Sequence, residues 1–122
     1  MKKAFAVVAL LFVMTSVNAQ TSTELVGKWK LVKWTKGGKE KNIQEKFKTT
    51  EVYQVFAANG HFTSINGDKT HEGNWELSKD NKKLTITVGV IVSETFKIEY
   101  FDAKKRVISL AMLGTLEYEK VD

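Results

Sequence analysis

Hydrophobic and polar residues alternate with a period of two through most of the chain beyond residue 26. The segments KLTITV (83–88), TFKIEY (95–100), TLEYEK (115–120) and GNWEL (73–77) each place apolar side chains on one face and polar side chains on the other. This alternation is typical of antiparallel strands that have one buried face and one face in water. Together these segments predict a protein built almost entirely of strands.

Polar, glycine-containing turns separate the predicted strands. FAANGHF (56–62) predicts a hairpin with Gly60 at positive φ, and three more polar turns fall at 66–69, 78–82 and 102–105. We expect strands at 27–35, 50–57, 61–65, 70–77, 83–88, 93–101, 106–112 and 115–121. The predicted fold class is all-β, an eight-stranded antiparallel up-and-down β-barrel, because closure removes the exposed edges of an open sheet. Residues 21–27 predict one helical turn capped by Ser22, and 41–48 predict a short helix or an irregular lid.

The first 19 residues predict a cleaved signal peptide. Lys2 and Lys3 precede the apolar stretch 4–13, and small residues stand at 17–19, before Gln20. We therefore expect an exported protein, periplasmic or secreted, with no stable membrane insertion after cleavage. Residues 20–122 then form one domain.

Lysines are concentrated near the start of this domain. Eight of them fall between Lys28 and Lys48, against two glutamates, Glu40 and Glu45. This stretch is either a solvated lysine-rich loop or a rim that attracts anions. It contains no recognised nucleic-acid-binding motif, so we expect no nucleic acid partner. The chain has no cysteine, so no disulfide contributes to its stability.

Several segments resemble a known family. LVGKWKL carries Gly27 and Trp29 in the glycine-x-tryptophan pattern of the first lipocalin strand. The later segments FAANGHF, EGNWELSKDNKKLTI and ETFKIEYFDAKKRVISL are similar to the small exported lipocalin-like domain proteins of Bacteroidetes-type bacteria. The resemblance spans residues 22 to 121. It implies a barrel that is closed at one end and holds small apolar molecules.

The resemblance also implies a structural floor made of Gly27, Trp29 and Arg106. In lipocalins the tryptophan packs at the closed end beneath a basic side chain, and Arg106 is the only arginine here. The family arginine usually lies later in the chain. The chain is also shorter than a full lipocalin and lacks its C-terminal helix.

In an up-and-down meander, alternate turns lie at the same end. The connections at 36–49, 66–69, 89–92 and 113–114 should share the open end, with apolar residues of the last two around the mouth. These residues either mark a binding surface, complete the core or form a dimer contact. Trp29 is accordingly predicted in the core, and Trp34, on the opposite side of the strand, near the mouth.

Strand parity selects the residues that would line the barrel and its mouth. The predicted ligand-binding residues are Lys33, Trp34, Gln54, Phe56, Phe62, His71, Trp75, Ile86, Ile91, Phe96, Ile98, Tyr100, Leu110, Met112 and Tyr118. Lys33 and His71 would meet a carboxylate head group, unless each extends to solvent. Many of the other side chains are large, so a filled barrel is the alternative to a cavity.

The sequence contains no recognisable catalytic constellation. It has no cysteine nucleophile and no G-x-S-x-G elbow, and His61 and His71 are expected at opposite ends of the barrel. We therefore predict no enzyme activity, no metal and no cofactor. The predicted function is binding of a small hydrophobic or amphipathic, possibly anionic, molecule by a monomer or weak homodimer. The alternative is a protein-interaction module whose apolar rim contacts another envelope protein.

Overall fold

The computed structural model describes residues 22–89 and 92–121. After a helical turn at 22–25, the described residues form nine strands and one short helix: β1 (Gly27–Lys36), β2 (Lys39–Lys41), α2 (Ile43–Phe47), β3 (Val52–Phe56), β4 (His61–Asn66), β5 (Lys69–Leu77), β6 (Lys83–Val88), β7 (Val92–Phe101), β8 (Lys105–Leu110) and β9 (Gly114–Lys120). The signal peptide predicted over 1–19 lies outside the described residues. Within them, no helix is long and apolar enough to cross a membrane.

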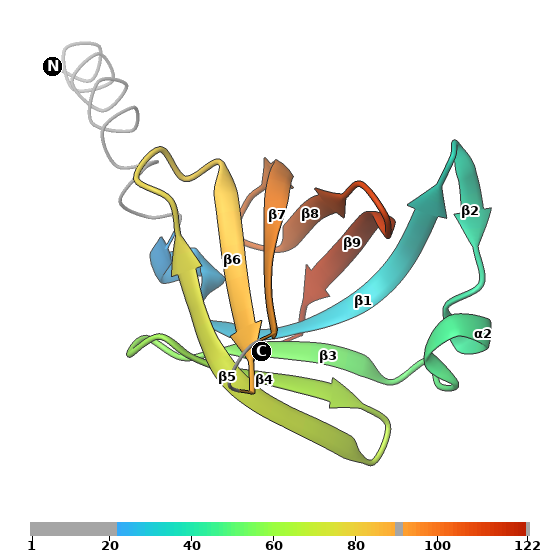
Figure 1. The fold of residues 1–122 in the computed structure, drawn as a ribbon, viewed down its shortest axis with the longest axis horizontal. Coiled ribbons are helices and arrows are strands. Elements are labelled where there is room, and N and C mark those ends of the chain that lie inside the picture. The colour runs from blue at the N-terminus through green and yellow to red at the C-terminus, as the bar shows by residue number, and fades with distance from the viewer. Residues whose placement is uncertain (1–21, 90–91, 122) are drawn as a thin grey trace, which may run out of the picture.

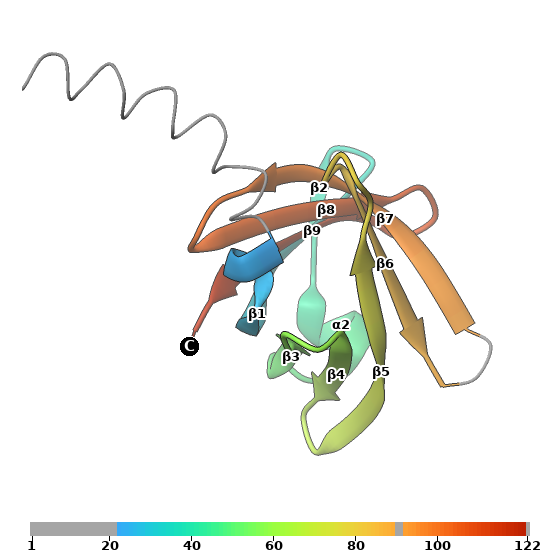
Figure 2. The same cartoon turned by 90° about the vertical axis from the view of Figure 1, so that its left-hand side faces the viewer.

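The strands form a closed antiparallel barrel (Figures 1 and 2). Every strand from β3 to β9 pairs with the next along the chain, and β1 pairs with both β3 and β9 to close the ring. This confirms the predicted eight-stranded up-and-down barrel. The ninth strand, β2, is a three-residue addition that the sequence analysis missed.

β1 is the strand that most of the architecture depends on. Its first half, Gly27 to Lys30, pairs with β3, while its last three residues pair with β2 on the same edge. Its other edge pairs with β9 from Trp29 to Thr35. The chain leaves the barrel wall through β2 and α2 before it returns as β3, as the right-hand side of Figure 1 shows.

The closed end is covered by a helical turn at residues 22–25 that precedes β1. Leu25 on this turn is fully buried, and its carbonyl accepts a hydrogen bond of 2.8 Å from the indole Nε1–H of Trp29. The Nζ of Lys120 donates to the carbonyl of Glu24 at 2.8 Å and fastens the turn to β9. The turn and the end of β9 thus seal this end together.

The hairpin predicted at 56–62 is present, and Gly60 has a φ of 93°. Phe56 and Phe62 face each other across it with ring centroids 5.1 Å apart, and both side chains are buried. The residues of segment 41–48 that form α2 include none that is buried. The buried core therefore lies inside the barrel wall, and α2 is an appendage at the open end.

Candidate functional site

The floor of the barrel is built around the guanidinium of Arg106. Arg106 lies on β8 and is fully buried. Its Cζ lies 4.3 Å from the ring centre of Tyr118, 4.8 Å from that of Phe56 and 5.2 Å from that of Trp29. The predicted contact of Arg106 with Trp29 is therefore present, as one of three ring faces around the cation. Each such contact contributes on the order of 1 kcal/mol.

The guanidinium of Arg106 has one hydrogen-bond partner in the described part of the chain. Its Nη2 donates to the Oε1 of Gln54 at 2.7 Å, and its Nε and Nη1 have no partner there. Burial lowers the pKa of Arg106 to about 10, partly offset by Tyr118. Burial likewise raises the pKa of Tyr118 to about 12, partly offset by the positive charge of Arg106. At neutral pH the floor therefore holds a positive charge next to a neutral phenol.

A bulge in β1 moves Lys33 and Trp34 to the faces opposite to those predicted. The pairing with β9 shifts between Leu31 and Lys33, so that Lys33 lies opposite Glu117 and Trp34 lies opposite Leu116. Residues opposite one another in an antiparallel pair share a face, and the buried Leu116 marks the inner one. The prediction that Lys33 points inward is therefore wrong, because the extra residue reverses the parity of the strand. Trp34 and Trp29 lie on the same, inner face.

A second bulge, in β7, displaces Tyr100. The pairing with β8 shifts between Ile98 and Tyr100, and Tyr100 is 49% exposed. Its hydroxyl donates to Asp102 at 2.6 Å on the outside of the barrel. The predicted inward placement of Tyr100 is wrong for the same reason as that of Lys33. Phe101 takes the interior position and packs against Trp29, with ring centroids 5.9 Å apart.

His71 is also exposed, although its parity was assigned correctly. It lies opposite Ser64, which lies opposite Gln54, so the three side chains form a row across β5, β4 and β3 on the inner face. His71 thus lies on the inner face of the barrel wall, whereas Lys33 lies on the outer face. Lys33 and His71 therefore do not converge, and the carboxylate site predicted between them is not formed.

An open pocket of about 180 Å³ occupies the mouth side of the barrel interior. Four of the predicted residues line it, namely Gln54, Phe62, Ile86 and Phe96. Val92, which was predicted among the apolar residues of the mouth, also lines it, and three further lining residues were not predicted, namely Ser64, Val88 and Glu94. Below the pocket, the side chains around Arg106 fill the barrel. The interior is therefore a shallow apolar cup above a solid floor.

A second pocket, of about 410 Å³, lies at the rim beside Trp34. Its wall combines Trp34, Met112 and Leu113 with residues of the β2 and α2 excursion: Lys36, Lys41, Asn42, Glu45 and Lys46. The Trp34 indole donates to the carbonyl of Leu113 at 2.7 Å, and the Nζ of Lys46 lies 5.6 Å from the centre of its ring. Met112 is 84% exposed. This rim pocket is cationic on one side and apolar on the other.

The family model of the lipocalin-like domain matches residues 25–105 of this sequence. The match covers more than half of the chain and includes the floor tryptophan, and it ends one residue before Arg106. The chain belongs to the lipocalin-like domain family. The comparison with curated proteins gives no match.

Solved structures share the lipocalin-like barrel. A lipocalin-like protein from Bacteroides uniformis superposes with a TM-score of 0.63 at 20% sequence identity, covering 80% of this chain and 99% of that one. An uncharacterized protein from Bacteroides eggerthii gives a TM-score of 0.59 at 19% identity, with 80% and 99% covered. At these identities the likeness concerns the fold.

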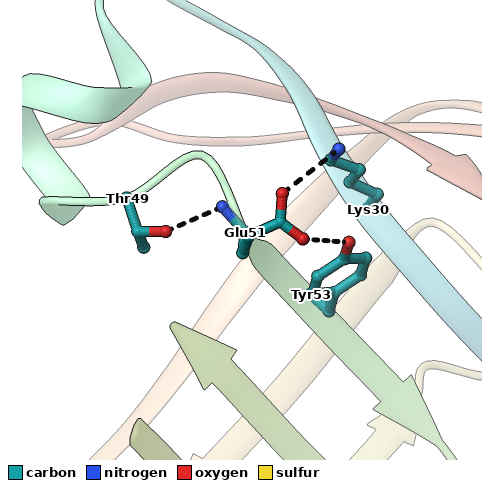
Figure 3. Close-up of polar contacts among 4 residues, drawn as sticks. All are labelled: Lys30, Thr49, Glu51 and Tyr53. Carbon is teal, nitrogen blue, oxygen red and sulfur yellow. Dashed lines mark hydrogen bonds and ion pairs between the residues drawn. The ribbon is translucent and has the colours of Figure 1, made fainter. Parts of the chain in front are cut away.

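The lysines of this lipocalin-like barrel do not form one patch. Figure 3 shows Lys30 on the outer wall, paired with Glu51 at 3.8 Å, while Glu51 accepts a hydrogen bond of 2.7 Å from the hydroxyl of Tyr53. Lys28 lies over the same tyrosine ring, 4.5 Å from its centre. Lys28 and Lys30 of β1 thus lie on the outer wall, whereas Lys36 lines the rim pocket.

The remaining predicted residues occupy several levels of the lipocalin-like barrel. Phe56 and Tyr118 belong to the filled floor, and Trp75 packs edge-on against Phe56 near the closed end, 5.8 Å between ring centroids. Ile98 and Leu110 are half-buried in the wall of the core. Ile91 lies outside the described residues. Of the missed residues, Ser64 has the parity of the predicted Phe62, a signal that the sequence did carry.

Proposed function

We propose that this lipocalin-like protein binds a small hydrophobic or amphipathic molecule in the open pocket on the mouth side of its barrel. The observation that carries the proposal is the composition of this pocket. The apolar side chains of Phe62, Ile86 and Phe96 are themselves buried and line the pocket above a floor already filled by protein. The exposed Val92 lines the same pocket at its mouth. Removing apolar surface from water supplies about 25 cal/mol per Å², less the cost of association.

The dimensions of the pocket favour a compact molecule. A volume of about 180 Å³ is smaller than the ~300–1,000 Å³ of typical small-molecule sites. A long acyl chain would therefore leave part of its length outside, towards the rim. The protein acts, in this proposal, by binding and not by catalysis, and it does so after export to the periplasm or the exterior.

Binding is tested by titrating residues 20–122 with 1-aminoanthracene, a compact apolar fluorophore. We expect saturable enhancement of its emission. Val88→Trp adds a ring at a position that lines the pocket, and we expect it to weaken binding about tenfold or more, which corresponds to roughly 1.4 kcal/mol. Thr87→Trp is the matched control, because Thr87 is the neighbouring residue on the opposite face, where its hydroxyl donates to Ser93. Equal weakening by both variants, or no saturable binding by the unmodified protein, would refute the proposal.

A specific observation favours a second candidate, an interaction with another protein through the rim. Met112 is 84% exposed and Val92 is 59% exposed, and both lie at the open end. Surface apolar residues grouped at loop ends occur at interaction sites. Under this alternative Met112→Asp disrupts capture of an envelope partner, and the fluorophore titration shows no saturable binding.

A further inference from the structure

The amide of Gln54 is held in one orientation by the buried arginine. Arg106 can only donate hydrogen bonds, so the Gln54 atom 2.7 Å from its Nη2 is necessarily the oxygen. The oxygen and nitrogen of a glutamine side chain are assigned from such partners. The Nε2 of Gln54 therefore points away from Arg106, with two N–H groups to donate.

These N–H groups have no protein acceptor within the described ranges. Gln54 lines the open pocket, and so does its cross-strand neighbour Ser64, whose hydroxyl is likewise without a partner in the described part of the chain. Directly opposite residues have Cβ atoms about 4.5–5.5 Å apart, so one acceptor can reach both. An apolar pocket thus has two adjacent donors on one wall.

The charge of Arg106 strengthens donation from Gln54. The ring faces of Tyr118, Phe56 and Trp29 surround the guanidinium, and no carboxylate forms an ion pair with it among the described residues. Hydrogen bonds in a chain polarise one another, so an amide whose oxygen faces a cation is a stronger N–H donor. The donor pair is therefore suited to an acceptor that carries partial negative charge.

A ligand with a full negative charge would be repelled at this pocket, because a carboxylate of the protein stands at its mouth. Glu94 lines its mouth and lies opposite Ile86 in the register of β6 and β7. No lysine lines this pocket, in contrast to the rim pocket beside Trp34. The surroundings therefore favour a neutral acceptor over a carboxylate.

We propose that the pocket recognises a compact apolar molecule bearing a neutral carbonyl group, such as a ketone, aldehyde or ester. The Nε2–H of Gln54 and the hydroxyl of Ser64 donate to the carbonyl oxygen, and the apolar body lies against Phe62, Ile86 and Phe96. This inference rests on the proposed function and adds the chemical class of the ligand. Leaving the donors unpaired would disfavour the matching hydrocarbon relative to the ketone.

The test compares acetophenone with isopropylbenzene, which has a methyl group in place of the carbonyl oxygen. Binding to ¹⁵N-labelled residues 20–122 is followed by NMR. We expect acetophenone to shift the side-chain amide signals of Gln54, and isopropylbenzene to leave them nearly unchanged while shifting the backbone signals of the pocket strands.

Gln54→Glu is the decisive variant. The new carboxylate keeps an acceptor for Arg106, so the fold is retained, but it removes both N–H donors and presents lone pairs to the carbonyl. We expect the affinity for acetophenone to fall about tenfold or more, since an unpaired buried acceptor costs on the order of 1–3 kcal/mol, and that for isopropylbenzene to change less than about twofold. Ser64→Ala should weaken acetophenone selectively by a smaller factor.

The outcomes separate this inference from the proposed function. If isopropylbenzene binds while Gln54→Glu affects both ligands equally, the carbonyl inference fails and the proposed apolar site stands. Benzoate that binds more tightly than acetophenone would overturn the choice of a neutral head group. If neither compound nor 1-aminoanthracene binds the unmodified protein, both proposals fail together.

Discussion

The guanidinium of Arg106 and the phenol of Tyr118 occupy one buried site and respond to pH in opposite directions. Burial lowers the pKa of Arg106 from its ordinary value to about 10, so in alkaline solution the folded protein releases this proton before the unfolded chain does. Folding is then favoured as pH rises between these values. The pKa of Tyr118 rises from 10.0 to about 12, so the folded protein retains the phenolic proton longer, and folding is disfavoured as pH rises. Between pH 10 and 12 the two contributions oppose each other.

Tyr118→Phe should expose this balance. Only the arginine contribution remains in the variant, so its free energy of unfolding should rise relative to that of the unmodified protein between pH 10 and 12. The relative gain should be about 1–3 kcal/mol, from 1.36 kcal/mol for each pKa unit. Urea unfolding at pH 8, 10 and 11 measures it. Tyr100→Phe is the control: the hydrogen bond of Tyr100 to Asp102 also raises its pKa, but Tyr100 is exposed, so its contribution should be smaller than that of the buried Tyr118. A parallel pH dependence in the unmodified protein and Tyr118→Phe would contradict the assignment.

The indole of Trp34 is fixed by its hydrogen bond to the carbonyl of Leu113. Trp34→Phe removes the donor and leaves that carbonyl without its partner. We expect a loss of about 1 kcal/mol in the free energy of unfolding, together with larger backbone NMR shifts at 111–114 than elsewhere in the described residues. Val32→Ala serves as control, since Val32 is the half-exposed residue of the adjacent bulge. Shifts confined to β1 would argue against the link to the β8–β9 connection.

The alternation of inner and outer residues along a strand can be followed from the sequence only as far as the first bulge. It places Trp29, Leu31 and Ile98 correctly, and the next residues on each strand wrongly. The bulges fall in LVKW and KIEYF, which contain no glycine, so no composition signal announces them. Their positions are set by how β1 and β7 must bend to meet neighbours far away in the sequence. At the floor, the resemblance led to the contact of Arg106 with Trp29, but the rings of Phe56 and Tyr118 around the same cation were not predicted, because they converge on it from β3 and β9.

At the scale of the elements, the β6 backbone leaves no room for a side chain on β5 at Gly73. A Cβ built on Gly73 would lie 1.8 Å from the carbonyl oxygen of Thr87. No side chain fits there without a movement of the backbone. The contact also lies next to Val88, so it helps to shape the wall of the open pocket.

Gly73→Ala should therefore destabilise the barrel although alanine has the higher intrinsic stability in most backbone conformations. We expect a cost of about 1–3 kcal/mol, the usual range for overpacking, measured as a shift of the urea midpoint. Asn74→Ala tests the same strand at an exposed neighbouring position and should cost less than about 0.5 kcal/mol. Similar urea midpoints for the two variants would show that the β6 backbone shifts at little cost to make room for the added methyl group.

Elements at the open end were the hardest to define from the sequence. The 41–48 segment predicted a short helix or an irregular lid, and the structure has a short helix there, α2. The side chain of Asn42 caps this helix by accepting a hydrogen bond of 3.0 Å from the backbone amide of Glu45. β2 was missed because its three residues are lysine, glutamate and lysine, all exposed. Such a strand has no apolar face, and only its pairing with β1 defines it.

For the whole molecule, burial is distributed unequally between the two ends. The fully buried side chains include Leu25, Trp29, Phe56 and Arg106 at the floor, whereas α2 at the open end contains none. Local opening follows the density of buried contacts. The backbone amides of β1 near Trp29 and of β8 near Ile108 should exchange with solvent most slowly, close to the rate of global unfolding.

Hydrogen exchange followed by NMR checks this gradient. Amides from 42 to 51 should exchange at least about a hundredfold faster than those of the floor, corresponding to roughly 2.7 kcal/mol less protection. Saturation with 1-aminoanthracene should slow exchange in β6 and β7 and leave the floor unchanged. Uniform protection along the chain would mean that the barrel opens only as a single unit.

The pairing of β1 with β9 has a consequence for the nascent chain. In the sequence, β1 is the first strand of the barrel and β9 is the last. A polypeptide that has emerged only as far as β8 therefore has two unpaired edges and an uncovered apolar floor. Contacts so distant in sequence form slowly, and open strand edges invite pairing with other chains. Synthesis must therefore reach β9 before the ring can close, and until then the free edges of β1 and β8 can pair with other chains.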